Sequence, residues 1–290
     1  MVLLVGATGK LGGRVARELL SRGTKLRALA RPSSASGPLR RMGAEIVAGD
    51  LRDPSSLASA CAGADTVITT ANTARRGGDD TVDSVDRAGT QALIDAARKA
   101  GAGHFVYMSV YGAVPESPVP FLAAKGESEQ HLRDSGLAWT IVAADAFMES
   151  WPGAIVGARV LAGQPVVIVG DGRRRHSYIA EHDVAQYLVA AATNPAARNR
   201  HLAIGGPQAL SWRDVIATYE RVLGAPIDAR YVQRGERVEG VPDVLLGLLA
   251  MSDTYDSEFD SSGLASEFGV MQTPLEPWVR ASLASARRGI

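Results

Sequence analysis

Residues 2–13 read Val-Leu-Leu-Val-Gly-Ala-Thr-Gly-Lys-Leu-Gly-Gly. The four apolar residues have the length and composition of a strand buried on both faces, as in a parallel sheet covered by helices. Gly6, Gly9 and Gly12 follow at G-x-x-G-x-x-G spacing, and an apolar pattern of helical period begins at Leu11. A strand, a glycine turn and a helix in this order predict a dinucleotide-binding unit. Backbone without side chains can approach a pyrophosphate, and the helix start presents free N–H groups to it.

The glycine spacing is weak by itself, because 31 of the 290 residues are glycine and a plain turn is the alternative. The order of strand and helix around it is the context that this motif requires. A phosphate loop of the G-x-x-x-x-G-K-[ST] type is excluded, because Leu4 and Leu11 stand where it needs Gly and Ser or Thr. We therefore expect the pyrophosphate to be bound by Gly6, Thr8, Gly9, Lys10, Leu11 and Gly12.

The length of 290 residues allows one large domain or a domain with an appendage. Lys and Arg number 31, as do Asp and Glu, so nothing in the net charge favours nucleic acid or an anionic membrane as a partner. The longest late apolar run, Val244–Met251, is far shorter than the ~20 residues of a membrane span. We expect neither a nucleic-acid nor a membrane partner.

The numbers and positions of cysteine and histidine indicate the cellular compartment and whether a metal site is expected. The single cysteine, Cys61, rules out an internal disulfide and falls in a helical pattern that favours packing. The sequence starts directly at the buried strand and not at a secretory leader, which together with the lone thiol predicts a cytoplasmic protein. The five histidines show no paired spacing, so no metal site is expected.

The residue after the second predicted strand, 25–30, bears on cofactor choice. An NAD-preferring site usually has Asp or Glu here, whereas Arg favours the 2′-phosphate of NADP. This chain has Arg31, and a guanidinium can bind a phosphate through two charge-assisted hydrogen bonds. The alternative is a solvated surface charge. We expect NADP(H) as the cofactor.

The alternation continues with strands at 44–48, 65–70 and 104–109, a helix at 82–100 and a loop at 75–80. It predicts an α/β fold with a doubly wound parallel sheet of the Rossmann type, whose strand ends line the ligand crevice. We expect Asp50 and Leu51 near the adenine, and Thr70, Ala71 and Asn72 along the ribose and phosphates. Ser109 stands at a further strand end, next to Tyr111.

The regular alternation weakens from Trp151 onward. We therefore expect a cofactor-binding Rossmann domain at residues 1–150, to which 176–200 returns, and a smaller substrate-covering portion at 151–290.

Three segments carry a family resemblance: Gly49-Asp-Leu51, Gln91-Ala-Leu-Ile-Asp-Ala-Ala-Arg-Lys-Ala-Gly-Ala-Gly-His-Phe-Val-Tyr-Met-Ser109 and Ser135-Gly-Leu-Ala-Trp-Thr-Ile141. With the glycine spacing, they resemble the atypical short-chain dehydrogenase/reductases of the NmrA-like group. That group includes isoflavone-reductase-like enzymes, NADPH:quinone reductases and NADP-sensing regulators. The resemblance covers most of residues 1–190, is fairly specific for the superfamily and says little about the substrate.

The superfamily resemblance implies a catalytic Ser and a Tyr-x-x-x-Lys motif, in which the phenol exchanges a proton with the substrate. Phe121-Leu-Ala-Ala-Lys125 occupies this place, so the lysine is kept and the phenol is lost. The resemblance implies that Lys125 holds the nicotinamide ribose and can act as acid or base, with Ser109 beside it and Tyr111 as a substitute donor. The alternatives are an exposed helix lysine and a packing tyrosine.

We expect an NADPH-dependent oxidoreductase that reduces a small carbonyl, quinone or conjugated substrate. Because the phenol is lost, a second interpretation stays open, in which the protein is non-catalytic and senses NADP(H). An isomerase with tightly held cofactor is weaker, because its proton chemistry normally needs the phenol. Both monomer and homodimer agree with the sequence, and the substrate's identity stays open.

Overall fold

The computed structural model describes residues 1–73, 78–239, 241 and 243–288, and within them the chain forms two compact units. The first unit comprises Met1–Ala144, Val184–Ile204 and Glu267–Val270, and the second comprises Asp145–Asp183, Gly205–Ser266 and Met271–Ile290. Of the loop expected at 75–80, residues 75–77 lie outside the described part, and 78 and 79 form a turn.

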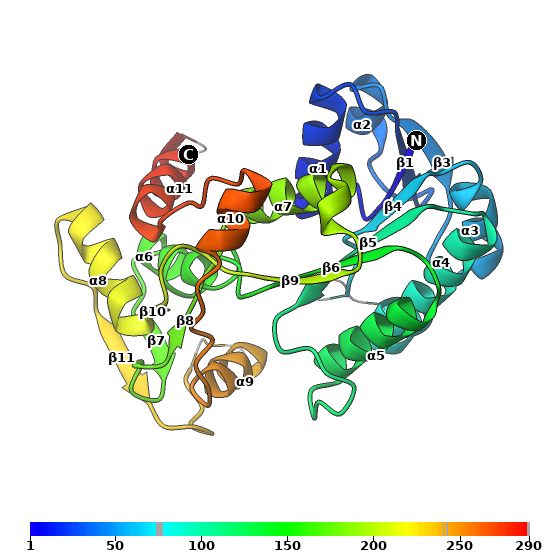
Figure 1. The fold of residues 1–290 in the computed structure, drawn as a ribbon. Helices are drawn as coiled ribbons and strands as arrows, with labels where there is room; N and C mark the ends of the chain where they lie inside the picture. The colour runs from blue at the N-terminus through cyan, green and yellow to red at the C-terminus, as the bar shows by residue number, and fades with distance from the viewer. Residues whose placement is uncertain (74–77, 240, 242, 289–290) are drawn as a thin grey trace. The chain divides into compact units, whose positions relative to one another are not determined.

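A parallel sheet is the centre of the first unit (Figure 1). Among the described residues it has seven strands in the order β3-β2-β1-β4-β5-β6-β9, and every neighbouring pair is parallel. The reversal of strand order between β1 and β4 is the hallmark of a doubly wound sheet, so the predicted fold class is confirmed. The strands are β1 (Val2–Val5), β2 (Leu26–Ala30), β3 (Glu45–Ala48), β4 (Thr66–Thr69), β5 (His104–Val110), β6 (Trp139–Ala144) and β9 (Arg200–Ile204).

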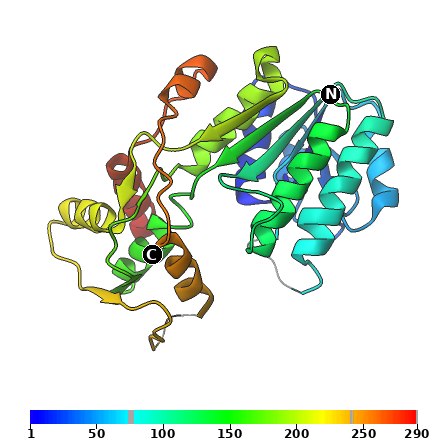
Figure 2. The ribbon, with the colours of Figure 1, turned by 60° about the horizontal axis from the view of Figure 1, so that its bottom comes forward.

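Helices cover both faces of this sheet, with α3, α4 and α5 on one face and α1 and α7 on the other (Figure 1). Helices α4 and α5 run side by side (Figure 2). Because the central strand β1 is enclosed from both sides, its four residues are all apolar and all buried. The helical elements are α1 (Lys10–Ser21), α2 (Gly37–Arg41), α3 (Pro54–Cys61), η1 (Val82–Arg87), α4 (Ala88–Lys99), α5 (Pro120–Asp134), α7 (Glu181–Thr193) and η3 (Pro195–Ala197).

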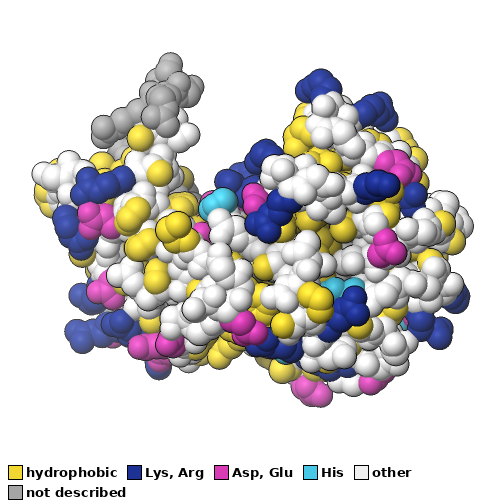
Figure 3. Space-filling model, turned by 45° about the horizontal axis from the view of Figure 1, so that its top comes forward, with side chains coloured by type: hydrophobic (Ala, Val, Ile, Leu, Met, Phe, Trp, Pro, Cys, Tyr) yellow, Lys and Arg dark blue, Asp and Glu magenta, His cyan; other side chains and the backbone are white. Residues whose placement is uncertain are grey.

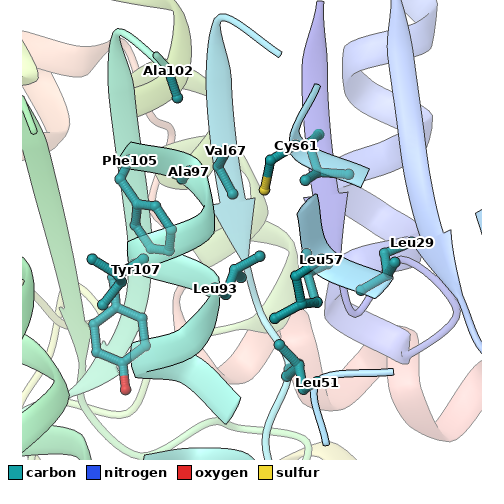
Figure 4. Packing of buried hydrophobic residues seen from close by; sticks show 14 of the residues in the cluster. Leu29, Leu51, Leu57, Cys61, Val67, Leu93, Ala97, Ala102, Phe105 and Tyr107 are labelled. Atoms are coloured by element: carbon teal, nitrogen blue, oxygen red, sulfur yellow. The ribbon is translucent and has the colours of Figure 1, made fainter. Parts of the chain in front are cut away.

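The core between the sheet and α3, α4 and α5 is apolar (Figure 4). Cys61 points into it beside Leu57 and Val67, and burial raises the pKa of its thiol to about 11. A thiol with so high a pKa stays protonated at neutral pH and packs as a small apolar group. The Tyr107 hydroxyl points away from the other side chains labelled in Figure 4.

The helix predicted at 82–100 is present, but its first six residues wind as a wider π-helical turn, η1, before α4 begins. The Thr90 hydroxyl donates to the Val85 carbonyl, five residues back, at 3.1 Å. Gly89 lies so close to the loop after β3 that an added Cβ would come within 2.9 Å of Leu51. The wider turn therefore brings the start of this helix against the ends of the strands.

The second unit is smaller and less regular. Within its described residues, β7 pairs with β11 in parallel and β8 pairs with β10 in antiparallel fashion. Its helix at 212–223 is amphipathic, and Ser211 and Asp214 form a reciprocal cap at its start. The elements are η2 (Pro152–Gly157), α6 (Ala158–Leu161), β7 (Val166–Val169), β8 (Arg175–His176), β10 (Leu210–Ser211), α8 (Trp212–Leu223), β11 (Ala229–Val232), α9 (Asp243–Ser252), α10 (Ser262–Phe268) and α11 (Leu275–Arg288).

Charged side chains are spread over the face shown in Figure 3, where Lys and Arg lie interleaved with Asp and Glu. This distribution agrees with the zero net charge of the chain. In the part of the chain that the structure describes, no helix has the length and apolar character needed to cross a membrane.

A buried histidine in the sheet predicts how stability depends on pH. The Thr140 hydroxyl donates to the Ala197 carbonyl at 2.7 Å and lies 2.8 Å from His104 Nε2, so it accepts a hydrogen bond from the neutral ring. Burial lowers the pKa of His104 from 6.5 to about 4, and the charge of Arg198 adds to this. Between these values the unfolded chain binds a proton that the folded chain does not, so stability falls as the pH falls.

We expect the free energy of unfolding to lose about 1–2 kcal/mol through His104 between pH ~6.5 and ~4, once solvent screening is allowed for. His104→Gln keeps a donor for Thr140 but does not titrate, so its stability should fall less over that range. Urea unfolding of both proteins across the range measures the difference. Parallel curves would show that His104 does not contribute to the pH dependence.

Candidate functional site

The turn between β1 and α1 brings a helix start against the end of a strand. Gly6 has a φ of +88°, a backbone conformation that side chains disfavour, and the Gly9 amide donates to the Gly6 carbonyl at 3.0 Å. A Cβ at Gly12 would lie 2.1 Å from that same carbonyl oxygen. Gly6 and Gly12 are therefore required by the close approach of the helix to the turn, and their expected role at a pyrophosphate stays a prediction.

Helix α1 begins without a side-chain cap, because its N-cap residue is Gly9. The first N–H groups of a helix have no partner within the helix, and here no capping side chain accepts from them. Lys10 and Leu11 are the first two residues of α1 and Thr8 precedes its cap. A helix start of this kind binds anionic groups such as phosphates.

The end of β4 lies beside this turn. The Thr70 amide and hydroxyl both donate to the Val5 carbonyl, at 2.9 and 3.3 Å, and Asn72 Nδ2 donates to the Thr70 carbonyl at 3.4 Å. Strands β1 and β4 flank the point where the strand order reverses, which is where ligands bind in open α/β sheets.

A pocket opens at this point and encloses about 390 Å³, including space open to solvent. Six of the residues expected at the cofactor line it: Gly6, Thr8, Arg31, Asp50, Leu51 and Ala71. Sequence reasoning missed five further lining residues, which are Val5, Leu29, Ser34, Gly49 and Val85. The position of Val5, Leu29 and Gly49 at or next to strand ends is a signal that could have found them.

Arg31 lies in a cluster of four charged side chains. Its Nη1 is 2.9 Å from Asp80 Oδ2, while Arg52 lies 3.4 Å from the other oxygen of Asp80 and 3.0 Å from Asp50 Oδ2. Partial burial pushes the pKa of Asp50 up, but hydrogen bonds from Arg52 outweigh it and hold this pKa below its ordinary value. The cluster sits at the pocket, since Arg31 and Asp50 both line it.

Lys125 lies on α5 and is buried, with only 2% of its surface exposed, so the alternative of an exposed helix lysine is wrong. Its Nζ donates to the Met108 carbonyl at 3.1 Å and lies over the rings of Tyr107 and Phe121, at 4.8 and 5.6 Å from their centroids. Burial lowers the pKa of this amine, although the charges of Asp86 and Glu129 oppose the shift.

Asp86 is the carboxylate that faces Lys125, and sequence reasoning missed it. It is fully buried at the π-helical turn η1, and its Oδ1 lies 3.9 Å from Lys125 Nζ. Its Oδ2 accepts from the Thr73 amide at 3.1 Å and also from the Thr73 hydroxyl. Two donors fix one oxygen, so the other stays directed at the ammonium. No local signal separates this Asp from the acids that commonly occupy helix starts.

Ser109 is fully buried, and its hydroxyl donates to Glu129 Oε1 at 2.5 Å. The other oxygen of Glu129 accepts from Arg133 at 2.8 Å. Burial pushes the pKa of Glu129 up, but hydrogen bonds from its neighbours, His201 and Ser109 first, bring this pKa below its ordinary value. Tyr111 follows β5 and is 38% exposed. The catalytic roles of Ser109 and Tyr111 stay predictions.

The residues present fit a dinucleotide. An uncapped helix start lies behind a turn that only glycine can form, and a guanidinium and a hydroxyl, from Arg31 and Ser34, line the same pocket. Within the described ranges, His, Cys, Asp and Glu do not gather in a group of three that could bind a metal ion.

Comparison with known proteins also indicates a protein that binds a nicotinamide dinucleotide. A family model described as NAD(P)H-binding matches residues 6–195. The "NAD(P)H azoreductase" of Xenophilus azovorans is 34% identical over 232 residues, which cover 80% of this chain and 76% of that protein. The "Photosystem II assembly factor Ycf39" of Cyanophora paradoxa is 30% identical over 223 residues, or 77% of this chain and 68% of that protein.

Among solved structures, the fold resembles an NADPH-dependent quinone oxidoreductase from Escherichia coli, complexed with NADPH, with a TM-score of 0.80. The match covers 96% of this chain and 98% of that chain at 22% sequence identity, so it supports the fold.

The close approach at Gly12 can be tested by adding one methyl group. We expect Gly12→Ala to weaken both NADPH and NADH binding about tenfold or more and to destabilise the fold by about 1–3 kcal/mol, because the Cβ collides with the Gly6 carbonyl. Gly13→Ala is the matched control, since its Cβ would lie in ordinary contact, 3.5 Å from the Ala7 carbonyl. Calorimetric titration and thermal unfolding measure both effects, and equal behaviour of the two variants would refute the packing argument.

Proposed function

The chain belongs to the NAD(P)H-binding family, in the NmrA-like and isoflavone-reductase-like group of atypical short-chain dehydrogenase/reductases, and on this premise we propose that it is an NADPH-dependent reductase. Its substrate in this proposal is a small carbonyl, quinone or related conjugated compound. The buried Lys125 is the observation that carries the proposal.

Burial of the Lys125 ammonium supports an enzymatic role, because keeping a charged group away from water costs free energy. Removing a charge from water costs several kcal/mol, and here the ammonium has a carbonyl at 3.1 Å and a carboxylate at 3.9 Å around it. Phe121, which stands in place of the usual phenol, can pack against the ammonium but cannot transfer a proton. Lys125 is therefore the group that would hold the nicotinamide ribose and supply a proton to the reduced substrate.

The bound cofactor would supply the hydride. The residues of this chain bind and orient it: the turn at Gly6 and Gly12 with the helix start at Gly9 would hold the pyrophosphate, and Arg31 would hold the 2′-phosphate. The charge of Asp86, 3.9 Å away, favours the charged form of Lys125 and opposes the effect of burial on its pKa. The names of the relatives support an electron-poor conjugated substrate, since one is an NAD(P)H azoreductase and a structural neighbour reduces quinones.

A second candidate is a protein that binds NADP(H) and signals its presence without turnover. The missing phenol at Phe121 favours it, and so does the similarity to a photosystem II assembly factor, whose name describes no redox reaction.

Replacing the lysine separates these functions. We expect wild-type protein to oxidise NADPH with members of a panel of quinones, enones and azo dyes, and Lys125→Met to lower kcat about 100-fold or more, because the proton donor is gone. Lys99→Met, at an exposed position on α4, is the control and should stay within about twofold.

The single variant leaves Asp86 buried opposite an apolar side chain, which can unfold the protein. The double variant Lys125→Met with Asp86→Asn removes that charge and should fold while staying inactive. Wild-type protein that binds NADPH but oxidises none of it across the panel would favour the sensing function.

Cofactor choice is tested at Arg31. Removing this guanidinium should weaken NADPH binding about tenfold or more and leave NADH binding within about twofold, because only NADPH carries the 2′-phosphate. Calorimetric titration of Arg31→Ala with both cofactors gives the two affinities. An unchanged NADPH affinity would show that Arg31 does not bind the 2′-phosphate.

A further inference from the structure

Asp80 is a carboxylate held between two guanidinium groups at the edge of the pocket. Its Oδ2 lies 2.9 Å from Arg31 Nη1 and its Oδ1 lies 3.4 Å from Arg52 Nε. Only 5% of the Asp80 side chain is exposed, so the contact is enclosed and weakly screened by solvent. The arginine that the fold offers to a phosphate thus already binds an anion supplied by the chain.

The position of Asp80 is set by the element that follows it. The next residue, Thr81, is the N-cap of η1, and its hydroxyl accepts from the Ser84 amide at 3.1 Å while the Ser84 hydroxyl accepts from the Thr81 amide at 3.0 Å. A capping box of this kind fixes where the chain enters the helix. The carboxylate is therefore placed against Arg31 by the local fold.

The contacts cited here join charges of both signs. Arg31 and Arg52 contribute two positive charges, and Asp50 and Asp80 contribute two negative ones. A 2′-phosphate brings close to two further negative charges at neutral pH, so at Arg31 it is repelled by Asp80 and competes with it for the guanidinium. A free ribose 2′-hydroxyl brings no charge and can donate a hydrogen bond to a carboxylate, which is how acidic residues favour NAD.

We propose that Asp80 sets the cofactor preference of this site: it competes with the 2′-phosphate of NADPH for Arg31 and accepts the ribose 2′-hydroxyl of NADH. The inference rests on the proposed function, because it takes the pocket to be a nicotinamide dinucleotide site. If this proposal holds, the site binds both NADPH and NADH. Its ratio of NADPH to NADH affinity is then smaller than in a site that has Arg31 without Asp80.

The test compares Asp80→Asn with Asp79→Asn. The two variants remove one carboxylate each, from adjacent positions. Asp79 is exposed and acts on Arg52 through its charge, whereas Asp80 is the residue in contact with Arg31. NADPH and NADH are titrated calorimetrically into both variants and wild type. Adenosine 2′,5′-bisphosphate and 5′-AMP serve as probes that contain the adenosine end alone, and thermal unfolding checks that each variant is folded.

We expect Asp80→Asn to raise the ratio of NADPH to NADH affinity about fivefold or more, and the ratio for the two adenosine probes in the same direction, because a competing charge is removed. Asp79→Asn should change both ratios by less than about twofold. If Asp80→Asn binds both cofactors with the wild-type ratio, Asp80 does not compete and the inference is wrong while the cofactor site stands. If wild-type protein binds neither cofactor, the proposed function fails and the inference fails with it.

Should Asp80→Asn unfold, Asp80→Ala and Asp80→Ser remove the same charge without the amide and are judged by the same ratio.

Discussion

The contact on which the site depends is the one between the start of α1 and the turn after β1. Gly12 packs on the Gly6 carbonyl at a distance that leaves no room for a Cβ, and Gly6 itself packs against Thr70 at the end of β4. These two contacts join the strand, the helix and the neighbouring strand at the point where the sheet reverses its order. The pocket lies at this point, and Gly6, Thr8 and Ala71 from the joined segments line it.

The fold could be predicted from the sequence because its signals are local. A buried strand, a glycine turn and an amphipathic helix each lie within about a dozen residues, and their repetition specifies the parallel sheet. The position of Arg31 follows in the same way from the end of β2. Family membership could be predicted too, because the segments that carry it are contiguous.

The partners of the site residues could not be predicted, because they come from distant parts of the chain. Asp80 meets Arg31 across 49 positions of sequence, and Lys125 meets Asp86 only because the π-helical turn η1 directs that carboxylate at α5. Helix periodicity does not distinguish a π-helical turn from the α-helix it precedes. The sequence therefore places Lys125 on a helix, but its burial and its contact with Asp86 depend on the tertiary structure.

Two carboxylates of the site, Asp80 and Asp86, lie close together in the sequence at the start of η1. Asp80 precedes the Thr81 cap of η1 by one residue, and Asp86 lies within the same π-helical turn, where it faces Lys125. π-Helical turns are rare and are often found at functional sites. This short segment carries the carboxylate next to the guanidinium proposed for one end of a dinucleotide and the carboxylate next to the ammonium proposed for the other end. Its capping box and the Thr73 contacts that hold Asp86 are therefore as important to the site as the glycine turn.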